Sequence, residues 1–399
     1  MFEGSKILIG VTGGISAYKT CDIIRTLKKN GADCRIIMTR SAQQFIAPLT
    51  FETLSENSVL CNLFPEQRLA RTIHIENARW ADVVLICPAT ANCIGKIANG
   101  LADDLLSTSV MATTAPVVLC PAMNKQMYLN PIVQGNIRKL SQLGYRFVVP
   151  GEGSLACGEE GIGRLAEKNR IIDSLKIALF GTDKLKGKCV LITAGRTEEA
   201  LDPVRFLTNR SSGKMGFALA EIAALHGAEV KLICGPNTLE PFAGVAIHRI
   251  RSAEEMAQAV FDEFEAYDII IMAAAVADFK PCEVSKNKIK KKDAKLSIRL
   301  EPTTDILHEL GTRKGNRILV GFAVETTDEI ANARRKLVEK KLDLIAINNP
   351  LTPGAAFEAD TNAVTLLNSA DELVQLPLDT KRNIAAQIFE RIIPLANER

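Results

Sequence analysis

Histidine is scarce in this chain, and its cysteines are not paired. The sequence has four histidines and ten cysteines, and no two cysteines stand in the C-x-x-C spacing of zinc and thioredoxin-like redox sites. Most of the cysteines lie inside apolar runs, where a thiol packs as a small hydrophobic group. We therefore expect neither a zinc site nor a disulfide framework, and a reduced, cytoplasmic location.

Long hydrophobic runs and a strong excess of charge are also lacking. No apolar stretch approaches the roughly 20 residues that a membrane-spanning helix needs. The first apolar run ends at Gly13-Gly14, which indicates a strand rather than a signal peptide. With a net charge of +3, composition gives no reason to expect a nucleic acid or a membrane as a partner.

What the chain does contain is an alternation of short apolar strands with helical stretches. Such strands occur at 6–11, 34–38, 83–87, 117–120 and 146–149, and the pattern restarts at 188–195 and continues at 229–234, 268–272, 318–322 and 343–347. Continuous apolar strands between helices are typical of parallel sheets covered on both faces. The sequence predicts an α/β protein with two Rossmann-like domains and mainly parallel sheets in tandem, the first flavodoxin-like. We place the domains at residues 1–180 and 181–399, with the joint in the polar stretch 181–188.

The turn after the first strand is rich in glycine but is not a dinucleotide fingerprint. Gly13 and Gly14 precede a helix for which we expect Ser16 to be the N-cap. The motif G-x-G-x-x-G is absent, as is the acidic residue about 20 positions later. The second strand ends in Thr39-Arg-Ser41, whose hydroxyls and cation suit a phosphate. A mononucleotide with an exposed phosphate therefore fits the first half better than NAD.

Three side chains suited to chemistry fall in this half. Asn124 directly follows an apolar strand, where open α/β sheets bind ligands, although a lone Asn commonly just fills a turn. His74 stands at a helix start, as a proton carrier or as a simple cap. Cys157 lies in the glycine-rich run 151–164, which we expect to be a mobile flap, and it is either a reactive thiol or a bystander. Arg164 at the end of the run could hold an anionic substrate.

Together these motifs resemble the homo-oligomeric flavin-containing cysteine decarboxylases, through about residue 175. The motifs are His74, Pro121-Ala-Met-Asn124 with Met127, and Ala156-Cys-Gly-Glu159 followed by Gly163-Arg164. In that family FMN oxidises the thiol-bearing carbon of a C-terminal cysteine, which then loses CO2. Phosphopantothenoylcysteine decarboxylases return the hydride and release 4′-phosphopantetheine.

The resemblance implies a role for each of these residues. His74 would take the thiol proton, Asn124 would orient the carboxylate, and Cys157 would deliver a proton to carbon. Substrate contacts are implied at Met123 and Arg164. Flavin contacts are implied at Gly13, Gly14, Ser16, Thr39, Ser41 and Thr90.

The second half of the chain contains a cluster of hydrogen-bond donors and a lysine-rich run. Hydrogen-bond donors gather in Asn209-Arg-Ser-Ser-Gly-Lys214 just before a helix, which suits a phosphate or a carboxylate, although a capped surface loop would look the same. The lysine-rich run 288–292 is either a solvated basic loop or a triphosphate site. The expected helix Glu325–Lys341 favours the second interpretation, because it carries Lys336 and Lys340 on one face.

These segments resemble phosphopantothenate–cysteine ligases over most of residues 188–350. In the bacterial type, CTP activates the carboxylate of 4′-phosphopantothenate as an acyl-cytidylate, and cysteine displaces CMP. The resemblance implies that Asp278 meets Mg²⁺ and that Lys288 acts where charge builds at the α-phosphate. It implies further nucleotide and substrate contacts at Asn209, Met272, Ala273, Ala274, Thr303, Thr304, Asp305, Ile306, Phe322, Lys336 and Lys340.

The chain departs from the ligase pattern in two places. It has Ala194-Gly-Arg-Thr-Glu-Glu199 where the family commonly reads Ala-Gly-Pro-Thr-Arg-Glu. It also has Pro302-Thr-Thr-Asp-Ile306 in place of an Asn-Pro-Asp-Ile segment. The second departure bears on the base or ribose contacts, and so on the preference for CTP over ATP.

The resulting prediction is a bifunctional enzyme of coenzyme A biosynthesis. The second domain would join cysteine to 4′-phosphopantothenate, and the first would decarboxylate the product. One rival keeps the flavin decarboxylase with another cysteine-terminated substrate and gives the second half no nucleotide chemistry. Another is a flavin-binding regulatory protein with degenerate sites. The resemblance also implies a homo-oligomer of flavin-domain trimers and ligase-domain dimers.

Overall fold

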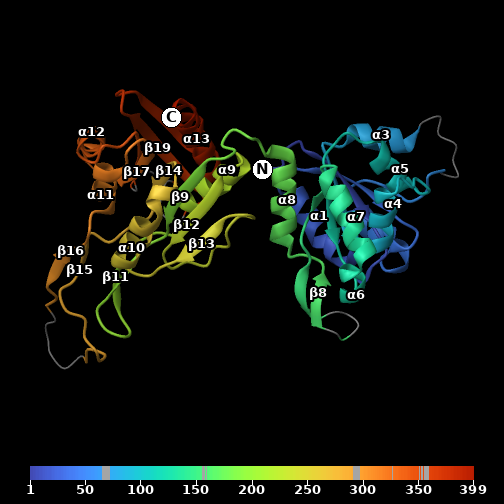
Figure 1. Ribbon diagram of the computed structural model, residues 1–399, viewed down its shortest axis with the longest axis horizontal. Coiled ribbons are helices and arrows are strands. Elements are labelled where there is room, and N and C mark those ends of the chain that lie inside the picture. Colours follow the sequence, from blue (N-terminus) through green and yellow to red (C-terminus); the bar gives the residue numbers. More distant parts are fainter. Residues whose placement is uncertain are drawn as a thin grey trace. The chain divides into compact units, whose positions relative to one another are not determined.

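A computed structural model describes residues 1–64, 72–154, 158, 160–290, 297–325, 327–349, 351, 354 and 359–399. These residues form two compact units, Met1–Phe180 and Gly181–Arg399, which Figure 1 shows in sequence colours. Each unit is built around its own sheet. The predicted fold class, two Rossmann-like domains in tandem with mainly parallel sheets, is confirmed.

The described residues of the first unit form a six-stranded sheet of order β3-β2-β1-β4-β5-β6, and all of its pairings are parallel. The strands are β1 (Lys6–Val11), β2 (Asp33–Met38), β3 (Val59–Leu60), β4 (Val83–Ala89), β5 (Val117–Pro121) and β6 (Arg146–Phe147). This is the Rossmann strand order, which reverses between β1 and β4. Ligands of such sheets bind beyond the carboxyl ends of the strands at that reversal.

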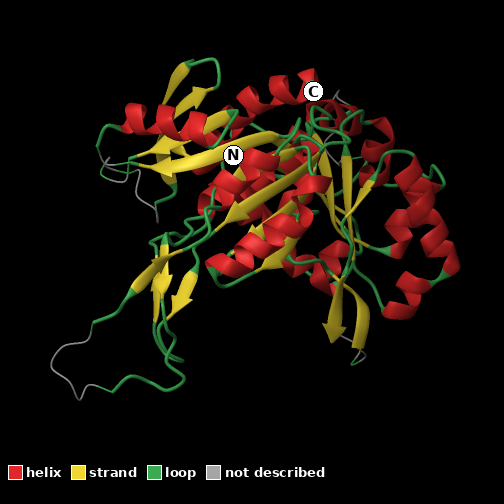
Figure 2. Cartoon of the chain, turned by 60° about the vertical axis from the view of Figure 1, so that its left-hand side comes forward, coloured by secondary structure: helices red, strands yellow, loops and turns green. Residues whose placement is uncertain are grey.

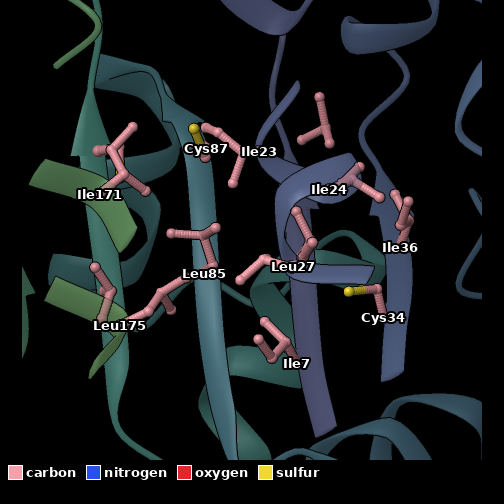
Figure 3. Close-up of a cluster of buried hydrophobic side chains, with 14 of the residues drawn as sticks. Ile7, Ile23, Ile24, Leu27, Cys34, Ile36, Leu85, Cys87, Ile171 and Leu175 are labelled. Atoms are coloured by element: carbon pink, nitrogen blue, oxygen red, sulfur yellow. The ribbon is translucent and has the colours of Figure 1, made fainter. Parts of the chain in front are cut away.

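Helices cover both faces of this sheet. They are η1 (Ile15–Lys19), α1 (Thr20–Lys29), η2 (Ala42–Gln44), α2 (Pro48–Ser55), α3 (Ile73–Trp80), α4 (Ala91–Ala98), α5 (Leu105–Ala112), α6 (Lys125–Leu129), α7 (Pro131–Gln142) and α8 (Lys168–Phe180). On one face, Leu27 of α1 and Leu175 of α8 meet Ile7 and Leu85 of the strands, as Figure 3 shows. Side chains of α4, α5 and α7 pack on the opposite face. Burial on both faces explains why these strands read as continuous apolar runs.

The first helix starts differently from the prediction. Gly14, and not Ser16, is the N-cap of η1, and no side chain caps that turn. The prediction failed because the chain enters a 3-10 turn before α1, which places Ser16 inside the turn. The predicted end of α1 is confirmed, since Asn30 is its C-cap and Gly31 follows with a φ of +86°.

The second unit contains the strands β9 (Cys189–Ala194), β12 (Glu229–Cys234), β13 (Ala246–Arg249), β14 (Ile269–Met272), β17 (Ile318–Val324), β18 (Leu344–Asn348), β19 (Thr361–Asn368) and β20 (Leu373–Thr380). Their order among the described residues is β13-β12-β9-β14-β17-β18-β19-β20. Pairing is parallel as far as β18 and antiparallel from β18 to β20.

The helices of this unit are α9 (Lys214–Leu225), α10 (Ala253–Glu263), η3 (Phe264–Ala266), α11 (Ile306–Arg313), α12 (Glu329–Glu339) and α13 (Lys381–Glu398). Side chains of α10, α11 and α12 pack on one face of the sheet. Helices α9 and α13 pack against each other and against the strands. The strands β19 and β20 and helix α13 are absent from the sequence-based prediction. The predicted helix 325–341 is shorter than expected, because it begins after Asp328, whose φ is +47°, and ends with Lys340 as its C-cap.

Among the residues that the structure describes, three small hairpins lie outside the two main sheets. They are β7 (Gly151–Ser154) with β8 (Glu160–Arg164), β10 (Glu198–Ala200) with β11 (Phe206–Thr208), and β15 (Phe279–Pro281) with β16 (Leu300–Pro302). Figure 2 shows the hairpins of the second unit extending beyond its sheet. Of the helices described, none is both long and apolar enough to cross a membrane.

Candidate functional sites

A cavity of about 650 Å³ opens beyond the carboxyl ends of β1, β4 and β5. Its size is typical of a small-molecule or cofactor site, for which roughly 300–1,000 Å³ is usual. The residues predicted from sequence that line it are Gly13, Gly14, Ser16, Thr90, Met123, Asn124 and Arg164. Tyr18 and Lys19 line it as well and were missed, because an exposed residue of a first helical turn carries no signal of its own in a single sequence.

Hydroxyl groups lock together the two turns that border this cavity. Thr12 Oγ1 donates to the Pro88 carbonyl oxygen at 2.7 Å and accepts from the Thr90 N–H at 3.1 Å. Thr20 Oγ1 donates to the Cys87 carbonyl oxygen at 2.8 Å. The turns after β1 and β4 therefore form one rigid edge at the point where the strand order reverses.

Glycine is required at the point where the turn after β1 approaches Ser41. A Cβ atom on Gly13 would come within 2.4 Å of the Ser41 Cβ atom, so the two turns touch there. A Cβ atom on Gly14 would meet only Pro88 and Thr90, both at 3.9 Å, so a longer side chain at Gly14 would fill space that a ligand could use. Thr39 and Ser41 do not line the cavity, and Thr39 Oγ1 accepts from the Ala42 N–H at 3.3 Å. Their flavin contacts stay predictions.

The lining fits a flavin mononucleotide. Ile15, Ala91, Met127 and Leu165 supply apolar surface for a planar ring system, and hydroxyl and cationic groups lie at the same rim. An apolar pocket with a few convergent polar groups is the usual composition of a cofactor site.

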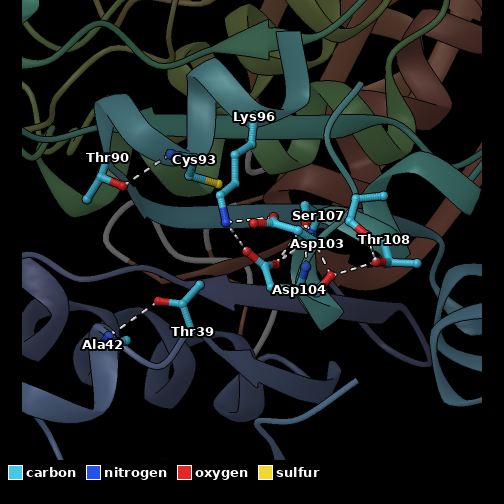
Figure 4. Close-up of polar contacts among 10 residues, drawn as sticks. Thr39, Ala42, Thr90, Cys93, Lys96, Asp103, Asp104, Ser107 and Thr108 are labelled. Carbon is cyan, nitrogen blue, oxygen red and sulfur yellow. Dashed lines mark hydrogen bonds and ion pairs between the residues drawn. The ribbon is translucent and has the colours of Figure 1, made fainter. Parts of the chain in front are cut away.

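Helix α4 and the turn after it are held by a network around Lys96, drawn in Figure 4. Lys96 Nζ lies 2.7 Å from Asp103 and 2.8 Å from Asp104. Asp104 also caps α5 by accepting from the Ser107 N–H at 2.8 Å. Burial by itself would raise the pKa of Asp104, but Lys96 and Ser107 outweigh it and hold the pKa below its ordinary value. Thr90 in turn caps α4, so this network stabilises a helix that starts at the cavity.

Within the glycine-rich run that was expected to be a mobile flap, β7 and β8 pair in an antiparallel hairpin outside the main sheet, and its mobility stays a prediction. Its glycines allow a close approach to the loop after β5. The Met123 N–H donates to the Gly163 carbonyl oxygen at 3.0 Å, and a Cβ atom on Gly163 would lie 2.2 Å from the Met123 carbonyl oxygen. The hairpin therefore packs directly on the cavity rim. Cys157 lies outside the described residues.

The two remaining polar candidates of this domain are not brought together in one chain. Asn124 lines the cavity and caps α6, with its Oδ1 accepting from the Gln126 N–H at 2.8 Å. His74 lies in the first turn of α3, in agreement with the helix start expected from sequence, but it is not among the residues that line the described cavity. Asn124 and His74 can act on one substrate only if another structural element brings them together.

A second cavity, of about 750 Å³, opens beyond the carboxyl ends of β14 and β17. The predicted residues that line it are Asn209, Met272, Ala274, Asp278, Thr303, Thr304, Asp305, Ile306, Phe322, Lys336 and Lys340. Ala273 and Lys288 do not line it as described, and Lys288 is exposed on the segment between β15 and β16. Arg210, Leu307 and Val324 line it and were missed, although Arg210 and Leu307 are direct neighbours of predicted residues.

Both lysines of this cavity have carboxylate partners. Lys340 Nζ lies 2.8 Å from Asp305, which also accepts from the His308 N–H at 3.0 Å. Burial would raise the pKa of Asp305, but Lys340 and the His308 N–H hold it below its ordinary value. Lys336 Nζ lies 2.6 Å from Glu325. A phosphate that bound these lysines would share them with acids already in place.

Small residues and backbone hydrogen bonds form the wall between β14 and the loop before α9. Asn209 Nδ2 donates to the Val276 carbonyl oxygen at 2.9 Å, and Thr303 Oγ1 donates to the Ala277 carbonyl oxygen at 2.6 Å. Asn209 thus joins the donor-rich loop to the wall as well as facing the cavity. Asp278 is exposed at the rim, and the described residues contain no group of three or more side chains suited to a metal. Mg²⁺ would fit there through one carboxylate and phosphate oxygens, which is its usual mode.

The fold and the two cavities define a protein with two doubly wound, ligand-binding domains in tandem. The flavoprotein family model matches residues 1–179, and the model of the DNA/pantothenate metabolism flavoprotein C-terminal domain matches residues 185–395. Over 401 residues, 100% of this chain and 99% of the relative, the chain is 46% identical to the coenzyme A biosynthesis bifunctional protein CoaBC of Bacillus subtilis (strain 168). The chain belongs to the family of coenzyme A biosynthesis bifunctional proteins, as its motifs predicted.

The chain is also similar to two further proteins. The chain is 44% identical over 359 residues to a cysteine/cysteine sulfinic acid decarboxylase of an unknown prokaryotic organism, covering 88% of this chain and 100% of that protein. A crystal structure of the C-terminal domain of a CoaBC protein is 40% identical, covers 55% of this chain and 100% of its own, and has a TM-score of 0.48.

Proposed function

We propose that this protein converts 4′-phosphopantothenate, cysteine and CTP into 4′-phosphopantetheine in two consecutive steps. It is a bifunctional enzyme of coenzyme A biosynthesis, with the decarboxylase in residues 1–180 and the ligase in residues 181–399. The observation that carries this proposal is the 46% identity to a bifunctional relative over both full lengths. Joining consecutive steps in one chain raises the local concentration of the intermediate.

In the ligase domain, the cavity beside β14 and β17 takes Mg²⁺ and CTP. Lys336 and Lys340 would face the phosphates, and Asp278 would help to hold the metal. Asn209, held against the Val276 carbonyl oxygen at 2.9 Å, faces the acyl-cytidylate. Lys288 stabilises the charge that builds at the α-phosphate while cysteine displaces CMP.

In the decarboxylase domain, the residues that line the cavity beside β1 and β4 would hold FMN, which would supply the hydride-transfer chemistry at the thiol-bearing carbon. Asn124 orients the substrate carboxylate with a neutral amide, which does not oppose departure of CO2 with a fixed charge. Cys157 delivers the final proton to carbon. Arg164 and Met123 hold the substrate at the rim.

In this scheme His74 takes the thiol proton, and it reaches the cavity because the protein forms a homo-oligomer. Because His74 is on α3 and away from the cavity lining of its own chain, a neighbouring copy would present it. Mixed oligomers of His74→Asn and Asn124→Asp chains should then regain decarboxylation that neither variant has alone. We place the protein in the cytoplasm, in keeping with the free thiols of its nine described cysteines.

The test is mass spectrometry of the products formed by the purified protein from 4′-phosphopantothenate, cysteine, CTP and Mg²⁺. We expect 4′-phosphopantetheine and CMP. Repeating the assay with ATP in place of CTP measures the nucleotide preference, on which the departure at Thr303 and Thr304 bears. Bound flavin with no condensation product would refute the ligase assignment.

One rival function is decarboxylation of cysteine itself, because the relative that aligns over 359 residues is named a cysteine/cysteine sulfinic acid decarboxylase. The same mass spectrometry, with free cysteine as the only substrate, tests this rival function. Release of a decarboxylated amine at a rate equal to that from 4′-phosphopantothenoylcysteine would replace the proposed substrate.

A further inference from the structure

Asp202 is a buried carboxylate that no step of the proposed reaction uses. It lies in the loop between β10 and β11 and is 3% exposed. A buried carboxylate is costly unless hydrogen-bond donors surround it. The donors of Asp202 therefore indicate what it is for.

Two of its donors are local and one is distant in the sequence. Asp202 Oδ1 accepts from the Val204 and Arg205 N–H groups, each at 2.8 Å, which closes a tight turn. Asp202 Oδ2 accepts from the N–H of Ile289 at 3.1 Å, across 87 positions of sequence. Burial would raise the pKa of Asp202, but these backbone N–H groups outweigh it and hold the pKa below its ordinary value. The carboxylate is thus ionised near neutral pH.

Ile289 is held from both sides of its backbone. Arg205 Nη2 donates to the Ile289 carbonyl oxygen at 3.1 Å, while Arg205 Nη1 lies 3.6 Å from Asp202 Oδ2. Earlier in the same segment, the Ser285 N–H donates to the Leu201 carbonyl oxygen at 3.0 Å. The segment that follows β15 is therefore held against the β10–β11 loop at Ser285 and at Ile289.

The residue next to this clamp is Lys288. Ile289 is half-buried, whereas Lys288 and Lys290 are exposed. A lysine on a flexible stem can act at a given phosphate oxygen only if its backbone is held, because each free torsion costs entropy on binding. The Asp202–Ile289 hydrogen bond supplies that constraint one residue away.

We propose that Asp202 is a positioning residue of the ligase, which fixes the backbone of Ile289 so that Lys288 reaches the α-phosphate during cysteine transfer. This inference rests on the proposed role of Lys288. It adds a residue that contacts neither substrate nor nucleotide. A charged acceptor suits the task, because hydrogen bonds to carboxylates are roughly twice as strong as neutral ones.

The test is Asp202→Asn, which keeps the shape and one acceptor oxygen but places an NH2 group against a backbone donor. Displacing a catalytic group by about 1 Å can cost roughly 100-fold in rate. We expect a fall of about 10- to 100-fold in the rate of cysteine transfer, with acyl-cytidylate formation from CTP and 4′-phosphopantothenate retained. Asp371→Asn, at an exposed ion pair with Arg334 in the same unit, is the matched control and should keep both half-reactions.

A second variant separates positioning from a general loss of structure. Residues that act as one unit give non-additive losses, so Asp202→Asn combined with Lys288→Arg, which keeps the charge and a measurable rate of cysteine transfer, should lose less than the product of the two single losses. Additive losses, or equal loss of both half-reactions in Asp202→Asn, would overturn the inference. Absence of any ligation by the unaltered protein would instead refute the proposed function, which is a distinct result.

Discussion

The contact between Gly163 and Met123 predicts that a single methyl group can separate the β7–β8 hairpin from the flavin cavity. Gly163 has a φ of +138°, and its Cβ would lie 2.2 Å from the Met123 carbonyl oxygen. Ordinary contacts begin at 3.4 Å, so Gly163→Ala must push the two backbones apart by about an ångström. No side-chain rotamer can relieve this, because both partners are backbone atoms or Cβ.

The cost can be estimated from its two parts. An alanine held at such a φ costs about 1–3 kcal/mol. The hydrogen bond from the Met123 N–H, 3.0 Å long, contributes about 0.5–1.5 kcal/mol more. Together roughly 2–4 kcal/mol would favour release of the hairpin, which corresponds to a ~30- to ~1,000-fold smaller closed population. We expect decarboxylation of supplied 4′-phosphopantothenoylcysteine to fall by a factor in that range while ligation is unchanged.

Gly153→Ala is the matched control in the same hairpin. Its φ is +136°, but its Cβ would meet only the end of the Arg164 side chain, at 3.1 Å, which can move. Gly153→Ala therefore introduces similar backbone strain to Gly163→Ala but no collision with a backbone atom. Rates are measured on protein with bound flavin quantified by absorbance. Equal losses in the two variants, or an unchanged rate in Gly163→Ala, would refute the reasoning from the Met123 contact.

Three further predictions follow from the two sites and the core. Lys288→Gln should abolish condensation of 4′-phosphopantothenate with cysteine and leave decarboxylation intact; loss of both activities would indicate misfolding. Cys157→Ser should release a product that is oxidised and decarboxylated but not reduced, which mass spectrometry detects as two hydrogens too few; fully reduced product at the normal rate contradicts its role as proton donor. Burial would raise the pKa of Asp343, but Arg399, Lys314 and the Leu319 N–H hold the pKa below its ordinary value. Its stabilisation is therefore fully present above the ordinary pKa of an aspartate and is lost as pH falls through the lower folded-state pKa. Asp343→Asn should cost about 2–4 kcal/mol near neutral pH, and urea unfolding should show this difference shrinking in acid; a difference constant with pH would be inconsistent.

The sequence predicted the parallel cores well because burial on both faces gives each strand an unbroken apolar run. Helix α9 and strand β12 have the bounds expected from sequence, Lys214–Leu225 and Glu229–Cys234. The antiparallel strands β19 and β20 were missed for the opposite reason. One side of β20 is exposed, and its buried and exposed residues alternate irregularly around Pro377, so no continuous run marks it.

Site prediction from sequence rests on side chains at or near the carboxyl ends of strands. Asn124 after β5 and Phe322 within β17 line cavities as expected, because the carboxyl ends of parallel strands meet at one edge. It was incomplete for contacts set by tertiary structure. The pairing of Lys340 with Asp305, and the clamp of Asp202 on Ile289, join residues 35 and 87 positions apart, and no local pattern reports such distances.

The antiparallel extension of the second sheet also determines where this chain can be shortened. Strand β18 is hydrogen-bonded to β17 on one side and to β19 on the other, and α13 packs along α9. A chain ending before Thr361 would leave a row of unpaired backbone groups on β18 and an apolar face on α9. Exposed edges of that kind recruit other strands, so such a fragment should self-associate even though all residues described as lining the cavity beside β14 and β17 are still present.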